Sequence, residues 1–213
     1  MLTIRDTEPF DWYQRWTGVK DIITQNVKPT YSFLNIGAGN SSNLKSNSLG
    51  MSEEMYEESY EHVTNIDISF TVIKQMTEMY KEKCPNMQWK QMDVRSLQFE
   101  EGTFDCVIDK GTFDSVLCGD GSGPNSEQTL NEIYRVLSPS GVYICISYGI
   151  PEQRESYFRN SAFDWDLTVH TVAKPTISTS AIVTTEDKDP KNFHYIYVMR
   201  KKLGGAVPQE EAE

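Results

Sequence analysis

The chain has 213 residues, and 38% of them are hydrophobic, which is enough to build the core of one domain. Its 20 basic and 31 acidic residues give a formal net charge of −11. This charge argues against a nucleic-acid binder, because such proteins use a basic face to displace counterions from phosphate. An acidic surface instead favours a small ligand or a basic protein partner.

No long apolar run is present, and the first residues lack the apolar stretch of a signal peptide, so we expect no membrane contact. The 4 cysteines and 3 histidines lack the paired spacing of a metal site, so no metal is expected. Cys106 and Cys145 fall inside apolar runs, which favours free, buried thiols in a reducing compartment. Nothing in the sequence demands a dimer, so we expect a cytoplasmic monomer.

Helices and strands alternate along most of the chain. In chain order, the expected elements are helix 9–27, strand 31–36, helix 52–62, strand 63–67, helix 69–80, strand 87–92, strand 103–108, helix 126–137 and strand 142–148. Ser52 and Ser69 are expected as N-caps of their helices. This alternation predicts a parallel sheet covered by helices on both faces.

The last third of the chain has a different pattern. Two further strands, 165–172 and 192–201, are expected to form a long hairpin around the polar loop 174–191. Residues 204–213 are expected to be a flexible acidic tail. We therefore expect a single domain of residues 1–203.

Ligand-type residues follow the carboxyl ends of the expected strands, which is the edge where open α/β sheets bind ligands. These residues are Gly37, Asp67, Asp93, Asp109 and Tyr148. The turn Gly37-Ala38-Gly39 lacks the third glycine of a dinucleotide fingerprint, because position 42 is Ser42, and no Walker lysine follows. The turn therefore favours a nucleoside ligand without a pyrophosphate.

Asp67 and Asp93 are the candidates for holding such a nucleoside. The carboxylate of Asp67 can accept hydrogen bonds from both ribose hydroxyls, although it could also cap the helix that starts at Ser69. Asp93 and the backbone N–H of Val94 can bind the edge of an adenine, although Asp93 could also be an ordinary turn residue. Together with Gly37, these residues predict an adenosine site.

Five segments together resemble the seven-strand (class I) S-adenosylmethionine-dependent methyltransferases. They are residues 34–41 (LNIGAGNS), 65–69 (NIDIS), 92–94 (MDV), 104–115 (FDCVIDKGTFDS) and 135–141 (RVLSPSG). The segments DKGTFD, MDVR and PFDWY are similar to those of the branch that contains the methyltransferase-like 13 proteins and the methyltransferases of elongation factor 1A lysines. The resemblance implies a three-layer αβα Rossmann-like sandwich, with a mostly parallel seven-stranded sheet and an antiparallel C-terminal hairpin.

The resemblance also implies a cofactor, S-adenosyl-L-methionine, with S-adenosyl-L-homocysteine as its product. The implied cofactor-binding residues are Trp12, Gly37, Gly39, Asp67, Ile68, Asp93, Val94 and Lys110. Gly37 would lie against the methionine part, Ile68 would pack on the adenine, and Lys110 would approach the methionine end through its backbone. Trp12 could instead belong to the core, because it shares a helical face with Trp16.

The branch implies a lysine of a basic protein, such as a translation elongation factor, as the methyl acceptor. This lysine must attack as the neutral amine, and the protein contributes mainly by positioning it. No Asn/Asp-Pro-Pro-aromatic segment follows strand 103–108, which argues against the planar amino groups of adenine or glutamine. The candidate catalytic residues at the rim of the site are Asp109, Thr112, Tyr148 and Trp165. Tyr148 could also be an ordinary strand-end aromatic.

Two alternatives remain at this point. The first is a small-molecule methyltransferase of the same fold, in which loop 174–191 covers the substrate. The second is a non-catalytic cofactor-binding module, because the branch usually carries an aromatic lid segment upstream of the Pro9-Phe10 motif. The residues that precede Pro9 contain no aromatic side chain.

Overall fold

The computed structural model describes residues 13–39, 50–175 and 189–203. Its strands are β1 Phe33–Ile36, β2 Val63–Asp67, β3 Gln88–Gln91, β4 Phe104–Lys110, β5 Leu137–Ser147, β6 Trp165–Ala173 and β7 Phe193–Lys201. Its helices are α1 Trp16–Thr24, α2 Met51–Glu57, α3 Phe70–Tyr80, α4 Thr112–Cys118, α5 Ser122–Val136 and α6 Pro151–Phe158, with a short 3-10 helix at Pro190–Asn192. Trp12, most of the loop 174–191 and the tail 204–213 lie outside the described residues.

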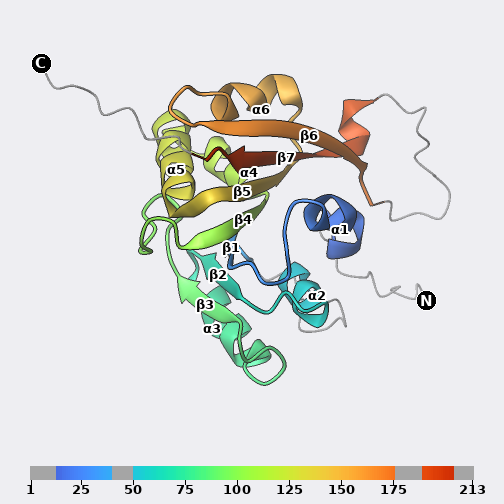
Figure 1. Cartoon of the computed structure of the whole chain (residues 1–213), viewed down its shortest axis with the longest axis vertical. Helices are drawn as coiled ribbons and strands as arrows, with labels where there is room; N and C mark the ends of the chain where they lie inside the picture. Colours follow the sequence, from blue (N-terminus) through green and yellow to red (C-terminus); the bar gives the residue numbers. More distant parts are fainter. Residues whose placement is uncertain (1–12, 40–49, 176–188, 204–213) are drawn as a thin grey trace, which may run out of the picture.

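The strands form one sheet in the order β3-β2-β1-β4-β5-β7-β6 (Figure 1). Strands β1 to β5 run parallel, whereas β7 pairs antiparallel with both β5 and β6. Side chains of α1, α2 and α3 build one core cluster, and side chains of α4, α5 and α6 build a second. The expected α/β sandwich, with a mostly parallel seven-stranded sheet and an antiparallel C-terminal hairpin, is therefore confirmed.

A triad of polar side chains, of which Ser52 and Asn65 are buried and Asn35 is half-buried, ties α2 to the sheet. Ser52 does not cap α2, contrary to expectation, because the N-cap is Gly50. The Ser52 hydroxyl instead accepts a hydrogen bond from Asn35 Nδ2 (2.8 Å) and donates one to Asn65 Oδ1 (2.6 Å). Asn35 and Asn65 are partners in the register of β1 and β2. Because unpaired buried amides are costly, the triad holds α2 across the two strands that carry the glycine turn and Asp67.

Several helices differ from the sequence expectation. Within the described residues, the expected helix 9–27 is helical only over Trp16–Thr24, and the expected helix 52–62 ends at Glu57. α5 begins at Ser122 rather than at position 126, because Gly121 has a φ of +71° and turns the chain just before it. α4 was not expected, and it follows β4 directly through Gly111, whose φ of +81° only glycine adopts readily. α6 was also not expected, and it has Pro151 in its first turn, where a missing N–H costs no hydrogen bond.

Asp109 caps α4 and is completely buried, at 0% exposure. Its carboxylate accepts hydrogen bonds from the backbone N–H groups of Thr112 (2.7 Å) and Phe113 (3.0 Å) and from the hydroxyl of Tyr143 (2.9 Å). Burial outweighs these donors and raises the pKa of Asp109 to about 7. The expectation of Asp109 at the rim of the site is therefore corrected: this carboxylate holds α4 in place and does not face an acceptor.

The four cysteines are free thiols, three of them buried as expected. Cys118, at the end of α4, is exposed instead, because it lies outside the strands that bury Cys106 and Cys145. Within the described ranges, no helix combines the length and apolar character needed to cross a bilayer. The same ranges contain no group of side chains suited to hold a metal ion.

Replacing Ser52→Ala removes the central hydroxyl of the triad while keeping good helix propensity. We expect the free energy of unfolding to fall by about 1–3 kcal/mol, because the buried amide of Asn65 and the half-buried amide of Asn35 both lose a partner. Urea denaturation followed by circular dichroism measures this change. The exposed Ser161→Ala is the matched control and should stay within about 0.5 kcal/mol of the wild type. An equally small effect at Ser52 would contradict the role of the triad.

Replacing Asp109→Asn should remove one pH-dependent contribution to stability. Because the folded pKa of Asp109 lies near 7 and its ordinary value is 3.8, the folded protein holds a proton that the unfolded chain has released between these values. This contribution is fully present below pH 4 and is lost as the pH rises through 7, with a slope of at most about 1.4 kcal/mol per pH unit. The stability of the wild type relative to the variant should therefore fall between about pH 4 and 7 in urea titrations. A difference that is flat or rises over this range would contradict the prediction.

Candidate functional site

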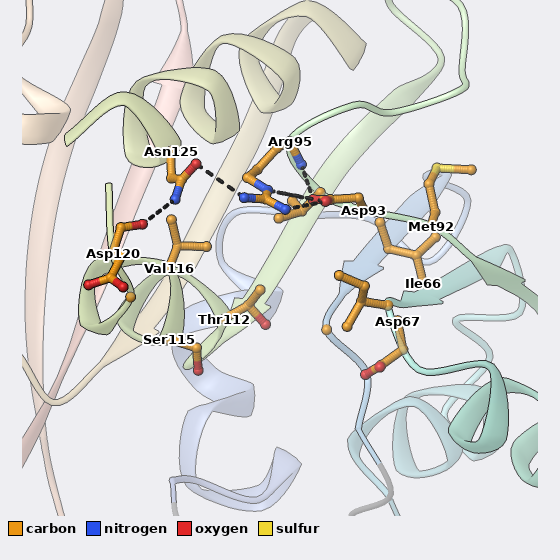
Figure 2. A pocket seen from close by; sticks show the side chains of 14 residues that line it. Ile66, Asp67, Met92, Asp93, Arg95, Thr112, Ser115, Val116, Asp120 and Asn125 are labelled. Carbon is orange, nitrogen blue, oxygen red and sulfur yellow. Dashed lines mark hydrogen bonds and ion pairs between the residues drawn. The ribbon is translucent and has the colours of Figure 1, made fainter. Parts of the chain in front are cut away.

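A cavity of about 490 Å³ opens at the carboxyl ends of the first three strands. One wall consists of Gly37, residues 66–68 at the end of β2 and residues 92–95 after β3. The opposite wall consists of side chains from α4 and from the start of α5 (Figure 2). Its volume is within the range of small-molecule sites. The edge of the sheet at which a ligand was expected therefore contains a cavity.

The glycine turn lies against the first turn of α4. Gly37 has a φ of +61°, and a Cβ at this position would collide with the side chain of Thr112. The Thr112 hydroxyl donates a hydrogen bond to the carbonyl oxygen of Ile36 at 2.9 Å. Both Gly37 and Thr112 line the cavity, but the hydroxyl of Thr112 is already used to hold the turn. The lack of a side chain at position 37 leaves the backbone open to close approach by a ligand.

The carboxylate of Asp67 accepts two hydrogen bonds from the protein and can accept two more from a ligand. Its Oδ2 accepts a hydrogen bond from the backbone N–H of Gly39 (2.9 Å), and its Oδ1 accepts one from Ser69 N–H (2.8 Å). An ionised carboxylate has about four acceptor positions, so each oxygen can accept one more hydrogen bond. This capacity matches the two hydroxyls of a ribose. Ser69 caps α3 with its own hydroxyl, as expected, so Asp67 is not required as the helix cap.

Asp93 is held by a residue that sequence reasoning missed. The guanidinium of Arg95 contacts both carboxylate oxygens, with Nη2 to Oδ2 at 2.6 Å, and Arg95 also donates to Asn125 of α5 at 3.1 Å (Figure 2). The hydrogen bond from Arg95 lowers the pKa of Asp93, which keeps this carboxylate ionised. An adenine amino group at Asp93 would therefore have to share the carboxylate with Arg95.

Apolar side chains surround the space between the two acids. Ile66, Ile68, Met92, Val94 and Val116 line the cavity. Ile66 and Met92 lie on the side opposite Val116 (Figure 2). Ile68 is 65% exposed, which leaves its surface free to pack on a planar ring. Three features of the cavity fit an adenosine-bearing cofactor. They are the accessible backbone at Gly37, the remaining acceptor positions of Asp67 and the apolar walls.

Other predicted cofactor residues lie next to this cavity rather than in it. Gly39 and Lys110 line a separate space of about 30 Å³ beneath the glycine turn, which they share with Gly37. Trp12 lies outside the described residues, so its predicted contact stays a prediction.

Trp165 is not part of the site, which corrects its predicted catalytic role. It pairs with Lys201 at the amino-terminal edge of the sheet, where its indole N–H donates to the carbonyl oxygen of Phe158 at 2.6 Å. Tyr148, by contrast, follows β5 at the carboxyl edge and is 46% exposed. Of the four predicted rim residues, only Thr112 and Tyr148 therefore face this edge.

Sequence reasoning also missed the side chains that α4, α5 and the segment between them add to the cavity. These are Ser115, Val116, Asp120 and Asn125. The polar segment 119–125 (GDGSGPN) was a signal for a turn near the site, because glycine, asparagine and aspartate favour such turns. Among the described residues that line the cavity, Asp67, Asp93 and Asp120 supply three carboxylates, and Arg95 supplies one guanidinium. This balance favours a ligand that carries positive charge.

Comparison with known proteins agrees with this geometry. The family model of a methyltransferase domain matches residues 34–145, which is more than half of the chain. EEF1A lysine methyltransferase 4 of Bos taurus is 31% identical over 170 residues, covering 76% of this chain and 63% of that protein. The eEF1A lysine and N-terminal methyltransferase of Mus musculus is 34% identical over 174 residues, covering 79% of this chain and 24% of that protein. The chain spans less than two thirds of the length of these relatives.

Solved structures share the fold at low sequence identity. A SAM-dependent methyltransferase from Methanosarcina mazei has a TM-score of 0.59 at 16% identity, covering 85% of this chain and 97% of that chain. The [4+2]-cyclase SpnF has a TM-score of 0.62 at 15% identity, covering 93% of this chain and 86% of that chain. Because one of these is a cyclase, the fold alone does not determine the reaction.

The sequence match is more informative than the fold, because it contains the residues that build the cavity. It includes the glycine turn, Asp67, Asp93 and the segment 109–114 between β4 and α4. The chain therefore belongs to the methyltransferase domain family, and the resemblance to the S-adenosylmethionine-dependent methyltransferases is confirmed.

Proposed function

We propose that the chain is an S-adenosylmethionine-dependent protein-lysine N-methyltransferase. The observation that carries the proposal is the cavity at the carboxyl edge, where the glycine turn, Asp67 and the apolar side chains of Ile68 and Val94 meet. The names of the eEF1A lysine methyltransferases among its relatives support a lysine of a translation elongation factor as the acceptor.

The cofactor would be held by the residues already described. In this proposal Asp67 binds the ribose, Ile68 and Val94 cover the adenine, and Gly37 gives the methionine part access to the backbone. Gly39, Asp93, Lys110 and Trp12 keep their predicted roles around the same ligand. The bound cofactor supplies an activated methyl group on a positively charged sulfur.

The remaining work of the protein is to bring the acceptor amine into line with that methyl group. Lysine must arrive as the neutral amine, and two effects act on its pKa in opposite directions. Desolvation at the site lowers this pKa, whereas nearby carboxylates raise it. Thr112 acts here by holding the turn after β1, because its hydroxyl is bound to the carbonyl oxygen of Ile36. The proton of the amine can leave to water, so no general base is assigned.

The charge of the chain supports a basic protein as substrate. A net charge of −11 attracts a positively charged surface and repels nucleic acid. We further propose that residues 1–203 form one methyltransferase domain that acts as a cytoplasmic monomer. The continuous seven-stranded sheet supports a single domain, and the free thiols support a reducing compartment such as the cytoplasm.

The direct test is to incubate the purified chain with tritium-labelled S-adenosylmethionine and either a cell lysate or purified eEF1A. We expect a labelled protein whose modified residue is identified as lysine by mass spectrometry. Label confined to small molecules would instead support a metabolite methyltransferase of the same fold. A folded chain that transfers no label would support a non-catalytic module.

Replacing Asp67→Ala should weaken cofactor binding by about 1.5–3 kcal/mol, which is roughly a 10- to 150-fold rise in the dissociation constant. The reason is the loss of the carboxylate that faces the ribose hydroxyls. Isothermal titration calorimetry with S-adenosylhomocysteine measures this change. Asp21→Ala, which removes an exposed carboxylate from α1, is the matched control. An unchanged dissociation constant in Asp67→Ala would remove this residue from the site.

A further inference from the structure

Asp114, in α4, is a buried carboxylate that the cofactor site does not use. It is 2% exposed and accepts five hydrogen bonds from four residues. Arg154 of α6 donates two of them, from Nε (3.1 Å) and Nη2 (2.8 Å), and the hydroxyl of Ser147 donates one at 2.6 Å. The other two come from the hydroxyl of Tyr13 (2.9 Å) and the backbone N–H of Tyr148 (3.1 Å). Asp114 therefore joins the segment before α1, the end of β5, and α6.

The two tyrosines form an aromatic surface beside this carboxylate. The ring centroids of Tyr13 and Tyr148 are 6.4 Å apart, and the ring of Tyr13 stacks on His194 at 5.4 Å. The guanidinium of Arg154 lies 5.6 Å from the ring centroid of Tyr148. Tyr148 is 46% exposed, so its ring can be reached from solvent. The buried side chains of Asp114 and Arg154 therefore hold the two tyrosines in place, and the ring of Tyr148 remains exposed to solvent.

This pair lies next to the cofactor cavity, across the first turn of α4. The ring of Tyr13 occupies the space that a Cβ on Gly111 would need. The next residue, Thr112, already lines the cavity, as does Ser115 one turn later. If adenosine lies along β2 and β3 as proposed, the side toward β5, where Tyr148 stands, remains for the acceptor. In that arrangement, the aromatic pair lies on the side of α4 that is left for the substrate side chain.

We propose that Tyr13 and Tyr148 form the walls that receive the substrate lysine, and that Asp114, paired with Arg154, is the positioning residue that holds both walls. The inference rests on the proposed function, and it adds a specificity-determining surface that the cofactor residues do not supply. Aromatic faces pack on the alkyl stem of lysine and attract its cationic methylated product.

The electrostatics of the pair agree with a role as walls rather than as bases. Burial, followed by the charge of Asp114, raises the pKa of Tyr13, and the hydrogen bond with Cys118 raises the pKa of Tyr148. Both hydroxyls therefore stay neutral at physiological pH. Arg154 balances the charge of Asp114 at a distance of 2.8 Å. The aromatic surface therefore adds no net negative charge that would raise the pKa of the incoming lysine and keep it protonated.

The test compares variants of the full chain in two assays, methylation of purified eEF1A and calorimetric binding of S-adenosylhomocysteine. Tyr148→Ala should raise the KM for eEF1A by about tenfold, whereas Tyr148→Phe, which keeps the ring, should stay close to the wild type. Both should bind the cofactor product as the wild type does. Tyr31→Ala, which removes a tyrosine just before β1 at the opposite edge of the sheet, is the matched control and should change neither quantity.

Asp114→Asn tests the positioning residue, because it keeps the shape and removes the charge. We expect a fall in kcat/KM for eEF1A of about a hundredfold with unchanged binding of S-adenosylhomocysteine. If this variant does not fold, Tyr13→Phe decides the question, because it removes only the hydroxyl that reaches Asp114. We expect Tyr13→Phe to lower kcat/KM by about fivefold, again without an effect on cofactor binding.

The outcomes separate this inference from the proposed function. A wild type that methylates eEF1A, with Tyr148→Ala and Tyr13→Phe at wild-type KM and kcat, would overturn the aromatic walls and leave the proposed function intact. A loss of cofactor binding in step with the loss of methylation would also overturn them, because it would show a general structural effect. A folded wild type that binds the cofactor product but labels neither eEF1A nor any protein of a cell lysate would overturn the proposed function, and this inference with it.

Discussion

The close contact between the turn after β1 and the first turn of α4 determines the geometry of the whole site. Gly37 leaves room for the side chain of Thr112, whose hydroxyl binds the carbonyl oxygen of Ile36. From the other side, Asp109 binds the backbone N–H groups of Thr112 and Phe113. The central strands and α4 are thereby fixed relative to each other at the carboxyl edge. The cavity on one side of this turn and the tyrosine pair on the other both depend on its position.

The strand pattern of the sequence was sufficient to predict the sheet and the edge at which the acids meet. Parallel strands end at the same edge, so acids that follow successive strands must lie near each other there. Asp67 and Asp93 are far apart in the sequence, yet both line one cavity. Such an inference needs only the strand direction and not the position of any side chain.

The errors concern residues whose surroundings depend on tertiary packing. Trp165 begins β6, which runs antiparallel to β7, so its pairing with Lys201 puts it at the edge opposite the site. Asp109 lies inside β4, which ends one residue later at Lys110, and a strand in the middle of the sheet is covered on both faces. Ser52 looked like a helix cap in the sequence, but Asn35 and Asn65 offered it buried partners. No local pattern reports such partners from distant strands.

The ion pair between Asp93 and Arg95 has a consequence for turnover. Since Asp93 already accepts hydrogen bonds from a guanidinium, an adenine amino group bound there, as proposed, would share the carboxylate with a charged donor. The net gain from this acid is then smaller than that of an unpaired carboxylate. When such a nucleoside leaves, the guanidinium of Arg95 remains hydrogen-bonded to Asp93. The carboxylate therefore always has a donor. Weak binding at this position favours rapid release of the nucleoside product after each catalytic cycle. Product release limits the rate of many enzymes.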